Sequence, residues 1–266
     1  MDILTHTLSG IAVATVVIPF TERKVVKSLK ILGFGALGGA LPDIDAISMW
    51  SRFDATFGRL FGLSHTGREI YGEKLWYSHH AFFHSIAAAL LIAVLLMLTG
   101  YVFLRIRKTA KIPLTGYYKR NVFLYITFIG AYLCHLLGDM PTPSSVWGGV
   151  NMFFPSDVYI GGSGKIWWWN NYDIFLLTLL CIAVNLTVII LFRKQYVRKI
   201  TLSFALFTFI LIIFQINTRK YNYAYNGNTT KYAEMEQQSK NEQERILGKR
   251  IYKCMKELDN RLPIHF

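Results

Sequence analysis

The residues best suited to chemistry in this sequence are histidines and aspartates that fall within or beside long apolar stretches. They are His6, Asp43, Asp45, His79, His80, His84, His135 and Asp139. Imidazole nitrogens and carboxylate oxygens together are typical ligands of Zn²⁺, and they also suit Mn²⁺ or Fe²⁺. A charged side chain at the centre of a membrane span costs about 2.5–3.5 kcal/mol, so such residues usually serve a function. The pattern therefore predicts a metal site.

The spacing within two segments fits shared ligation. His135 and Asp139 form the best local pair, because residues four apart project from the same face of a helix. Asp43 and Asp45 follow Pro42 in the run Leu-Pro-Asp-Ile-Asp, and this proline should end or kink the helix before it. Such a kink could turn both carboxylates inward.

The third segment reads Tyr-Ser-His-His-Ala-Phe-Phe-His-Ser and offers three histidines. His80 and His84 share a helical face, whereas His79 and His84 do so only if the helix starts after His79. Spacing alone leaves the choice between His79 and His80 open.

Each candidate also has a simpler interpretation. A single buried histidine such as His6 is more often a packed, hydrogen-bonded residue than a ligand. An aspartate at a helix end, such as Asp45 or Asp139, is commonly a cap. A metal site is favoured because four separate stretches supply imidazoles and carboxylates.

The elements that must position these residues are six long apolar stretches. The chain has 266 residues, of which 53% are hydrophobic and 17% are charged. Each stretch reaches the roughly 17–25 residues that a membrane-spanning helix needs. They cover Ile3–Phe20, 31–49, 81–104, 122–140, 174–192 and 200–216. We expect an all-α polytopic bundle in residues 1–216, and a polar linker with a short helix near 244–258 in residues 217–266.

The alternating direction of the spans brings the candidates to one membrane face. His6 and His84 stand at the starts of the first and third spans. The aspartates and His135 stand at the ends of the second and fourth spans. Starts of odd spans and ends of even spans lie on the same side of the bilayer, so the candidates should meet there.

Basic residues give the orientation. The net charge is +13, but basic residues beside the spans lie in three alternate loops rather than in one patch, so we expect no nucleic-acid binding. They are Arg23, Lys24, Lys27, Lys30, Arg105, Arg107, Lys108, Lys111, Lys119, Arg120, Arg193, Lys194, Arg198 and Lys199. The positive-inside rule makes these loops cytoplasmic and puts the N-terminus and the metal site outside an inner membrane. Arg219 and Lys220, directly after the sixth span, argue mildly against this orientation.

At these motifs the sequence resembles the YdjM-like family of membrane-bound, metal-dependent hydrolases. The family pattern is an early His, then Leu-Pro-Asp-Ile-Asp, His-Arg-Gly-x-Thr-His-Ser, and His-x-x-x-Asp followed by Thr-Pro. The matching positions are His6, 41–45, 79–85, 135–139 and 142–143, so the resemblance covers about residues 1–155. His80, Ala81 and Phe83 replace Arg, Gly and Thr of the third motif, and that register favours His79 over His80 as the ligand.

The candidate ligands are more than one tetrahedral set can use. They are His6, Asp43, Asp45, His79, His84, His135 and Asp139. We expect two or more Zn²⁺ ions bridged by Asp43 or Asp139, with a metal-activated water as nucleophile. Asp45 would be a ligand or an acceptor that orients this water, and Ser85 would support a ligand. The family is similar in motif style to zinc-dependent phospholipase C and P1 nuclease, which implies phosphodiester hydrolysis.

Two loops suggest a lipid substrate. Phe53, Phe57, Leu60 and Phe61 form one stripe of the 51–78 loop, as in a helix lying at a membrane surface, or packed under a loop. The 142–172 loop contains paired glycines and four tryptophans, and reads either as an aromatic cover or as an interfacial belt. Membrane lipids and a lipid or lipid-linked phosphoester are the expected partners. Ion or substrate transport and a non-enzymatic, metal-stabilised protein are the alternatives, and the oligomeric state stays open.

Overall fold

A computed structural model describes residues 1–22, 24–107 and 112–262, and its regular elements are helices. Arg23, Lys108 and Lys111 of the basic loops lie outside the described residues. Six helical segments are long and apolar enough to cross a membrane, which confirms the expected all-α polytopic bundle. They are α1 (Ile3–Val17, extended by the 3₁₀ turn Ile18–Phe20), α2 (Val25–Ala40) with the 3₁₀ segment η2 (Leu41–Met49), α5 (Ile86–Ile106), α6 (Leu114–Asp139), α7 (Tyr172–Leu191) and α8 (Lys194–Asn217).

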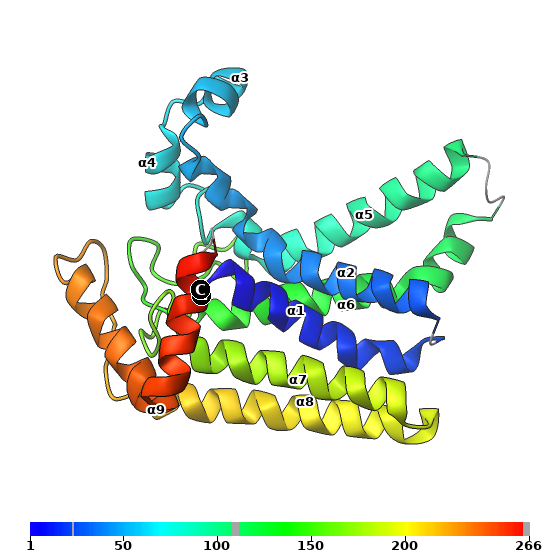
Figure 1. Ribbon diagram of the computed structural model, residues 1–266. Helices are drawn as coiled ribbons and strands as arrows, with labels where there is room; N and C mark the ends of the chain where they lie inside the picture. The colour runs from blue at the N-terminus through cyan, green and yellow to red at the C-terminus, as the bar shows by residue number, and fades with distance from the viewer. Residues whose placement is uncertain (23, 108–111, 263–266) are drawn as a thin grey trace.

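The two ends of the bundle differ in what they carry (Figure 1). One end gathers the starts of α1, α5 and α7, the ends of η2, α6 and α8, and both ends of the described chain; we call it the site end. The described residues of the three basic connections lie at the opposite end. The long polar connections are therefore confined to the site end.

Glycines allow α1, α2 and α6 to pack closely. A Cβ atom on Gly10 of α1 would lie 2.1 Å from the backbone oxygen of Gly35 in α2, and one on Gly39 would lie 2.3 Å from the oxygen of His6. On the other side of α2, a Cβ atom on Gly38 would lie 2.4 Å from the oxygen of Phe128 in α6. Small residues at helix contacts are the usual means of tight packing in membranes. Here they bring His6 and the end of α2 next to α6.

A second apolar contact fixes α5 against α6. The small residues Ala88, Ala89 and Ala93 of α5 pack against the buried rings of Phe128 and Tyr132 in α6. The Tyr132 hydroxyl also donates to the backbone oxygen of Phe83, just before α5. This packing holds the segment before α5 close to the end of α6.

The connection between η2 and α5 is wound into short helical pieces. They are η3 (Asp54–Gly58), α3 (Arg59–Phe61), α4 (Gly67–Gly72) and η4 (Phe82–His84). The surface helix expected from the aromatic stripe is therefore a π-helical turn followed by one α-helical turn. Phe53 is buried against this segment, while Leu60 and Phe61 are exposed, so only the end of the stripe is available to a membrane surface.

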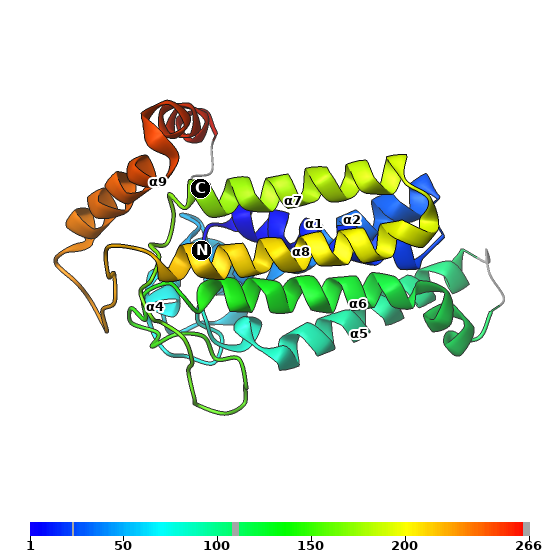
Figure 2. The same ribbon diagram turned by 90° about the horizontal axis from the view of Figure 1, so that it is seen from below.

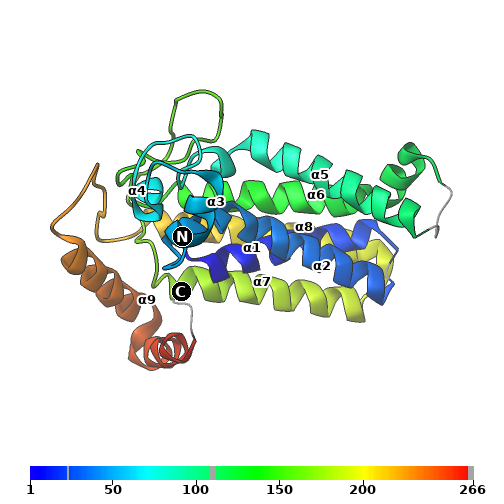
Figure 3. The same ribbon diagram turned by 90° about the horizontal axis from the view of Figure 1, so that it is seen from above.

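The C-terminal segment is more ordered than the sequence suggested. Helix α9 (Tyr232–Arg261) begins twelve residues before the expected position and is kinked at Gly248, which has a φ of 73°. Its buried polar groups bond to the bundle: Glu242 accepts from the backbone nitrogen of Lys220, and Gln243 from that of Asp173. Hydropathy cannot reveal such docking, because the buried groups are polar. Figures 1 and 3 show α9 and the α3–α4 segment on opposite sides of the site end.

Candidate metal centre

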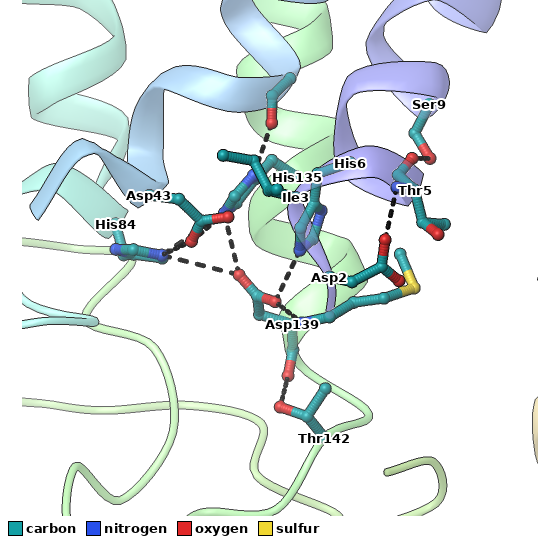
Figure 4. A network of polar contacts seen from close by, with 12 residues as sticks. Asp2, Ile3, Thr5, His6, Ser9, Asp43, His84, His135, Asp139 and Thr142 are labelled. Atoms are coloured by element: carbon teal, nitrogen blue, oxygen red, sulfur yellow. Dashed lines mark hydrogen bonds and ion pairs between the residues drawn. The ribbon is translucent and has the colours of Figure 1, made fainter. Parts of the chain in front are cut away.

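The histidines and aspartates converge at the site end from several elements. His6 comes from α1, Asp43 from η2, His84 from η4, and His135 and Asp139 from the last turns of α6. Their side chains point toward one another in Figure 4. Both His84 and His135 are fully buried, whereas the Asp43 side chain is 14% exposed. The structure therefore brings together residues that the alternating direction of the spans predicted to meet.

Pro42 explains how two nearby aspartates reach different sides of one ring. It lies at the start of η2, where the chain changes from α-helix to the tighter 3₁₀ helix. Asp43 then lies near His84 Nε2, at 3.6 Å, while Asp45 lies near His84 Nδ1, at 3.1 Å. The two carboxylates therefore have different roles toward the same imidazole.

Four donor atoms form a compact set around one point. His84 Nε2 and His135 Nε2 are 3.4 Å apart, and Asp43 Oδ1 is 3.6 Å from each of them. Asp139 Oδ2 is 3.0 Å from His135 Nε2 and 3.7 Å from His84 Nε2. Ligands at 2.0–2.1 Å in a tetrahedron around Zn²⁺ lie about 3.3–3.4 Å from one another. The separations within the group of Asp43, His84 and His135 are close to this spacing, and Asp139 lies against both imidazoles.

The hydrogen bonds around this set leave lone pairs on its inner side. His135 Nδ1 donates to the backbone oxygen of Gly39 at 2.7 Å, and a carbonyl can only accept, so the neutral ring carries its lone pair on Nε2. His84 Nδ1 bonds to Asp45 in the same way. Asp139 Oδ2 is buried without a hydrogen-bond donor. Lone pairs that face one another in a buried space fit a cation.

Asp45 orients two histidines. Its Oδ1 accepts from His79 Nδ1 at 2.7 Å and its Oδ2 from His84 Nδ1 at 3.1 Å. A carboxylate that holds the far nitrogen of a metal-binding histidine fixes both its tautomer and its direction. Of the two roles expected for Asp45, ligand or acceptor, these contacts fit an acceptor. They orient imidazoles rather than a water molecule.

The field at His84 favours positive charge. Burial alone would lower the pKa of this ring, but the Asp45 and Asp43 carboxylates raise it to about 10. A divalent ion would supply this positive charge in place of the proton, because metal binding releases protons from its ligands.

His80 also faces the site, although the family register favoured His79 alone. Its backbone has a φ of 64°, its oxygen accepts from the nitrogen of Asn151, and its Nδ1 donates to the oxygen of Gly149 at 3.0 Å. Burial and the neighbouring His79 and His84 rings lower its pKa well below the usual range, so its Nε2 carries a lone pair. One nitrogen each of His79, His80 and His84 lie within 4.8 Å of one another. In the sequence, the adjacent histidines His79 and His80 were the only indication of this second group of donors.

His6 lies beside the four-donor set. Its Nε2 is 2.9 Å from Asp139 Oδ1, and its ring stacks on His135 with 3.6 Å between centroids. The Met1 amino group also contacts Asp139 Oδ1, and His6 Nδ1 has no hydrogen-bond partner. These contacts hold Asp139 in position. One donor atom each of His6, His135 and Asp139 lies within 4.8 Å of the other two, so these three residues could also hold a metal ion, as predicted for His6.

Ser85 has a helix-capping role rather than the expected contact with a ligand. Its hydroxyl donates to the backbone oxygen of Phe82 at 2.6 Å and accepts from the nitrogen of Ala88 at 3.1 Å. Because both contacts are with backbone groups at the start of α5, Ser85 sets where this helix begins. It thereby helps to fix His84, one residue earlier.

A cavity of about 490 Å³ opens above the donors. His79, His80, Asp43 and Asp139 reach its wall, and its other sides are mainly aromatic. The aromatic residues are Tyr71, Trp147, Trp168, Trp169, Tyr225 and Tyr232. Trp147 lies over the ring of His80, with 4.7 Å between centroids, and its Nε1 donates to the backbone oxygen of Tyr71. Three of the four tryptophans of the expected cover are thus part of the wall, whereas Trp167 is buried and does not line the cavity. No motif pointed to the three tyrosines.

Comparison with known families places most of the chain in a family of membrane proteins. The family model described as YdjM inner membrane protein matches residues 1–221. The chain belongs to the YdjM inner membrane protein family. No curated protein and no solved structure matches it. The match establishes an integral membrane protein, and it includes all the candidate donors but ends before Tyr225 and Tyr232 of the cavity wall.

Proposed function

We propose that this YdjM family member is a membrane-bound, metal-dependent hydrolase that cleaves a phosphoester of a lipid or lipid-linked substrate. The observation that carries the proposal is the four-donor set: the His84 and His135 Nε2 atoms lie 3.4 Å apart, and each lies 3.0–3.7 Å from oxygens of Asp43 and Asp139. Nitrogen and oxygen donors at these separations suit Zn²⁺ best, with Mn²⁺ or Fe²⁺ as alternatives. The cavity beside this set provides room for a substrate and for a water molecule.

The residues of the chain divide into ligands and groups that orient them. A first ion would be held by the four-donor set, and a second by the group that includes His79 and His80. Bound ions would supply Lewis acidity and activate a water molecule for hydrolysis. Asp45 holds His79 and His84 in place through their Nδ1 atoms.

The cavity supports a phosphoester substrate with an apolar part. Among the described residues that line it there is no lysine or arginine, so the charge of a phosphate would be met by the metal ions. The aromatic walls exclude water from the reacting group and suit an amphiphilic molecule. The relation to zinc-dependent phospholipase C and P1 nuclease remains an analogy of motif style.

We also propose that the reaction takes place outside the cytoplasm. The described basic residues of the connections between α1 and α2, α5 and α6, and α7 and α8 lie at the end opposite the donors. Since basic loops are retained in the cytoplasm, the site end would face the other side of the inner membrane.

The test compares two variants that each remove one carboxylate. Asp43→Asn removes a ligand, whereas Asp157→Asn changes an exposed residue of the 142–171 loop. Purified protein would be assayed with a phospholipid and a soluble phosphodiester, with Zn²⁺ or Mn²⁺, and with and without chelator. Asp43→Asn should lower turnover at least about 100-fold, because even changes outside the ligand set cost 10–100-fold. If the wild type binds metal tightly and cleaves neither substrate, the hydrolase proposal is wrong.

A further inference from the structure

An apolar crevice lies beside the metal centre, on the membrane-facing side of the bundle. It has a volume of about 410 Å³ and runs between α6 and α8. Both helices pack against α1, and Figure 2 shows them on the same side of the bundle. The α8 wall is the stripe Phe209, Ile212, Ile213 and Ile216, whose spacing defines one helical face. The crevice therefore lies in the span region, and residues of the 140–166 loop line it at the site end.

The crevice covers most of one leaflet in depth. Its α8 wall extends from Phe209 to Asn217, which is the last residue of that helix at the site end. Eight residues of α-helix rise about 12 Å. Half of a hydrocarbon core is about 15 Å thick. The crevice thus lies in the leaflet on the same side as the metal centre.

The crevice and the metal cavity share a wall. Met1 lines both of them. Gly138, next to the ligand Asp139, also lines the crevice, and a Cβ atom there would lie 3.0 Å from His6 Cε1 and 3.2 Å from Met1 Cε. Met1 is thus a wall of both spaces, and the His6 ring lies against Gly138. Ser163 and the exposed Lys165 make the mouth of the crevice polar.

We propose that this crevice binds one hydrocarbon chain of a phospholipid whose phosphoester group lies in the metal cavity. The inference rests on the proposed hydrolase function and adds the way in which the substrate is held. An apolar stripe at hydrocarbon depth matches the hydrocarbon chain, and Met1, which lines both the crevice and the metal cavity, places the two spaces next to each other. A phospholipid that belongs only to the surrounding bilayer would contact α8 without a crevice that adjoins the metal cavity.

Binding can be measured without activity. Protein stripped of metal would be placed in nanodiscs that contain a phosphatidylglycerol with a photoreactive diazirine on one acyl chain, and labelled residues would be mapped by mass spectrometry. We expect labels on residues 209–217 of α8 and 134–138 of α6. Ile213→Trp fills the crevice and should lower this labelling about tenfold. The control Ile210→Trp changes an exposed residue of α8 that is not part of the crevice wall.

Three outcomes separate this inference from the proposed function. With metal restored, Ile213→Trp should lower phospholipid hydrolysis about tenfold and leave hydrolysis of a soluble phosphodiester unchanged. Labelling of the crevice without hydrolysis of either substrate would refute the hydrolase and keep the lipid site. Wild-type labels spread evenly around α8, or equal labelling of the two tryptophan variants, would mean ordinary bilayer contact and would overturn the crevice proposal.

Discussion

His84 Nε2 and His135 Nε2 lie 3.4 Å apart, although 51 positions separate the two residues along the chain. Each ring is held from behind through Nδ1, by Asp45 in one case and by the backbone of Gly39 in the other. The closeness of the two lone pairs is therefore built in by the surrounding fold. An ion between them would link η2, η4 and α6, and most predictions below depend on that link.

Purified protein should contain about two divalent ions per chain, as expected for paired donor groups. His135→Ala or Asp139→Ala should each lower that content, because either change removes one corner of the four-donor set. Elemental analysis in mild detergent is the measurement. His65→Ala is the control, because the His65 side chain is 39% exposed and lies outside the donor groups. Unchanged metal content in both ligand variants would remove this pair from the site.

Asp45→Asn should weaken metal binding about 10–100-fold while leaving the ligands themselves in place. The amide can accept through only one oxygen, so it cannot hold His79 and His84 as the carboxylate does. Titration against a competing chelator would measure the dissociation constant, with Asp157→Asn as the control. A dissociation constant equal to that of the wild type would mean that Asp45 does not orient these ligands.

Chelator should lower the unfolding temperature of the wild type, and added Zn²⁺ should restore it. A ligand that binds only the folded state adds about 2.7 kcal/mol of stability at 100 times its dissociation constant. Thermal unfolding in detergent would show the change. Asp43→Asn, which lacks one donor, should respond less; an equal response in this variant would mean that the stabilising ion lies elsewhere.

Arg219→Met should destabilise the protein by about 3–5 kcal/mol, because it leaves a buried partner charge unpaired. Arg219 Nη2 lies 2.9 Å from Asp173 Oδ1, and the two side chains are only 3% and 4% exposed. Chemical unfolding would measure the loss, and Asp173→Asn in the same chain should recover part of it. Lys253→Met breaks an exposed pair and should cost at most about 1 kcal/mol. If Arg219→Met and Lys253→Met lowered the free energy of unfolding equally, burial of the Arg219–Asp173 pair would not explain the loss of stability.

Reporter fusions should place the connection after Arg107 in the cytoplasm and the Gly161–Gly164 turn outside. We expect this because the connection after Arg107 lies among basic residues, and basic loops are retained in the cytoplasm. Activity of an alkaline phosphatase fusion distinguishes the two sides, because this reporter is active only outside the cytoplasm. Opposite locations to those expected would reverse the proposed orientation, and a shared location would contradict the six-span arrangement.

The meeting of donors from different spans could be anticipated, whereas their exact partners could not. To predict that His6, His84 and His135 meet, only the number of spans and their alternating direction are required. Hydropathy gives both. The position of His80 depends on its φ of 64° and on the backbone oxygen of Gly149, 69 residues away. The alignment of the motif contains neither this backbone angle nor this contact. It therefore favoured His79 and left out His80, which faces the same cavity.

The C-terminal segment shows the same difference. Glu242 and Gln243 look like surface residues of a polar linker, yet each is only 1% exposed. Their partners are backbone nitrogens of Lys220 and Asp173, and no periodicity in the polar sequence indicates that pairing. Spans with strong hydropathy were therefore predictable, while a polar helix held by specific bonds was not.

The extent of the family match divides the cavity into two parts of different origin. Every candidate donor lies within residues 1–221, while Tyr225 and Tyr232 close the cavity from the segment that follows. The donors and this part of the wall can thus change independently, since no ligand comes from the C-terminal segment among the described residues. The protein is in this sense modular: the candidate donors come from residues 1–139, and part of the cavity wall comes from the segment after α8. Exchanging the segment after α8 would redesign the shape of the cavity without altering a single donor.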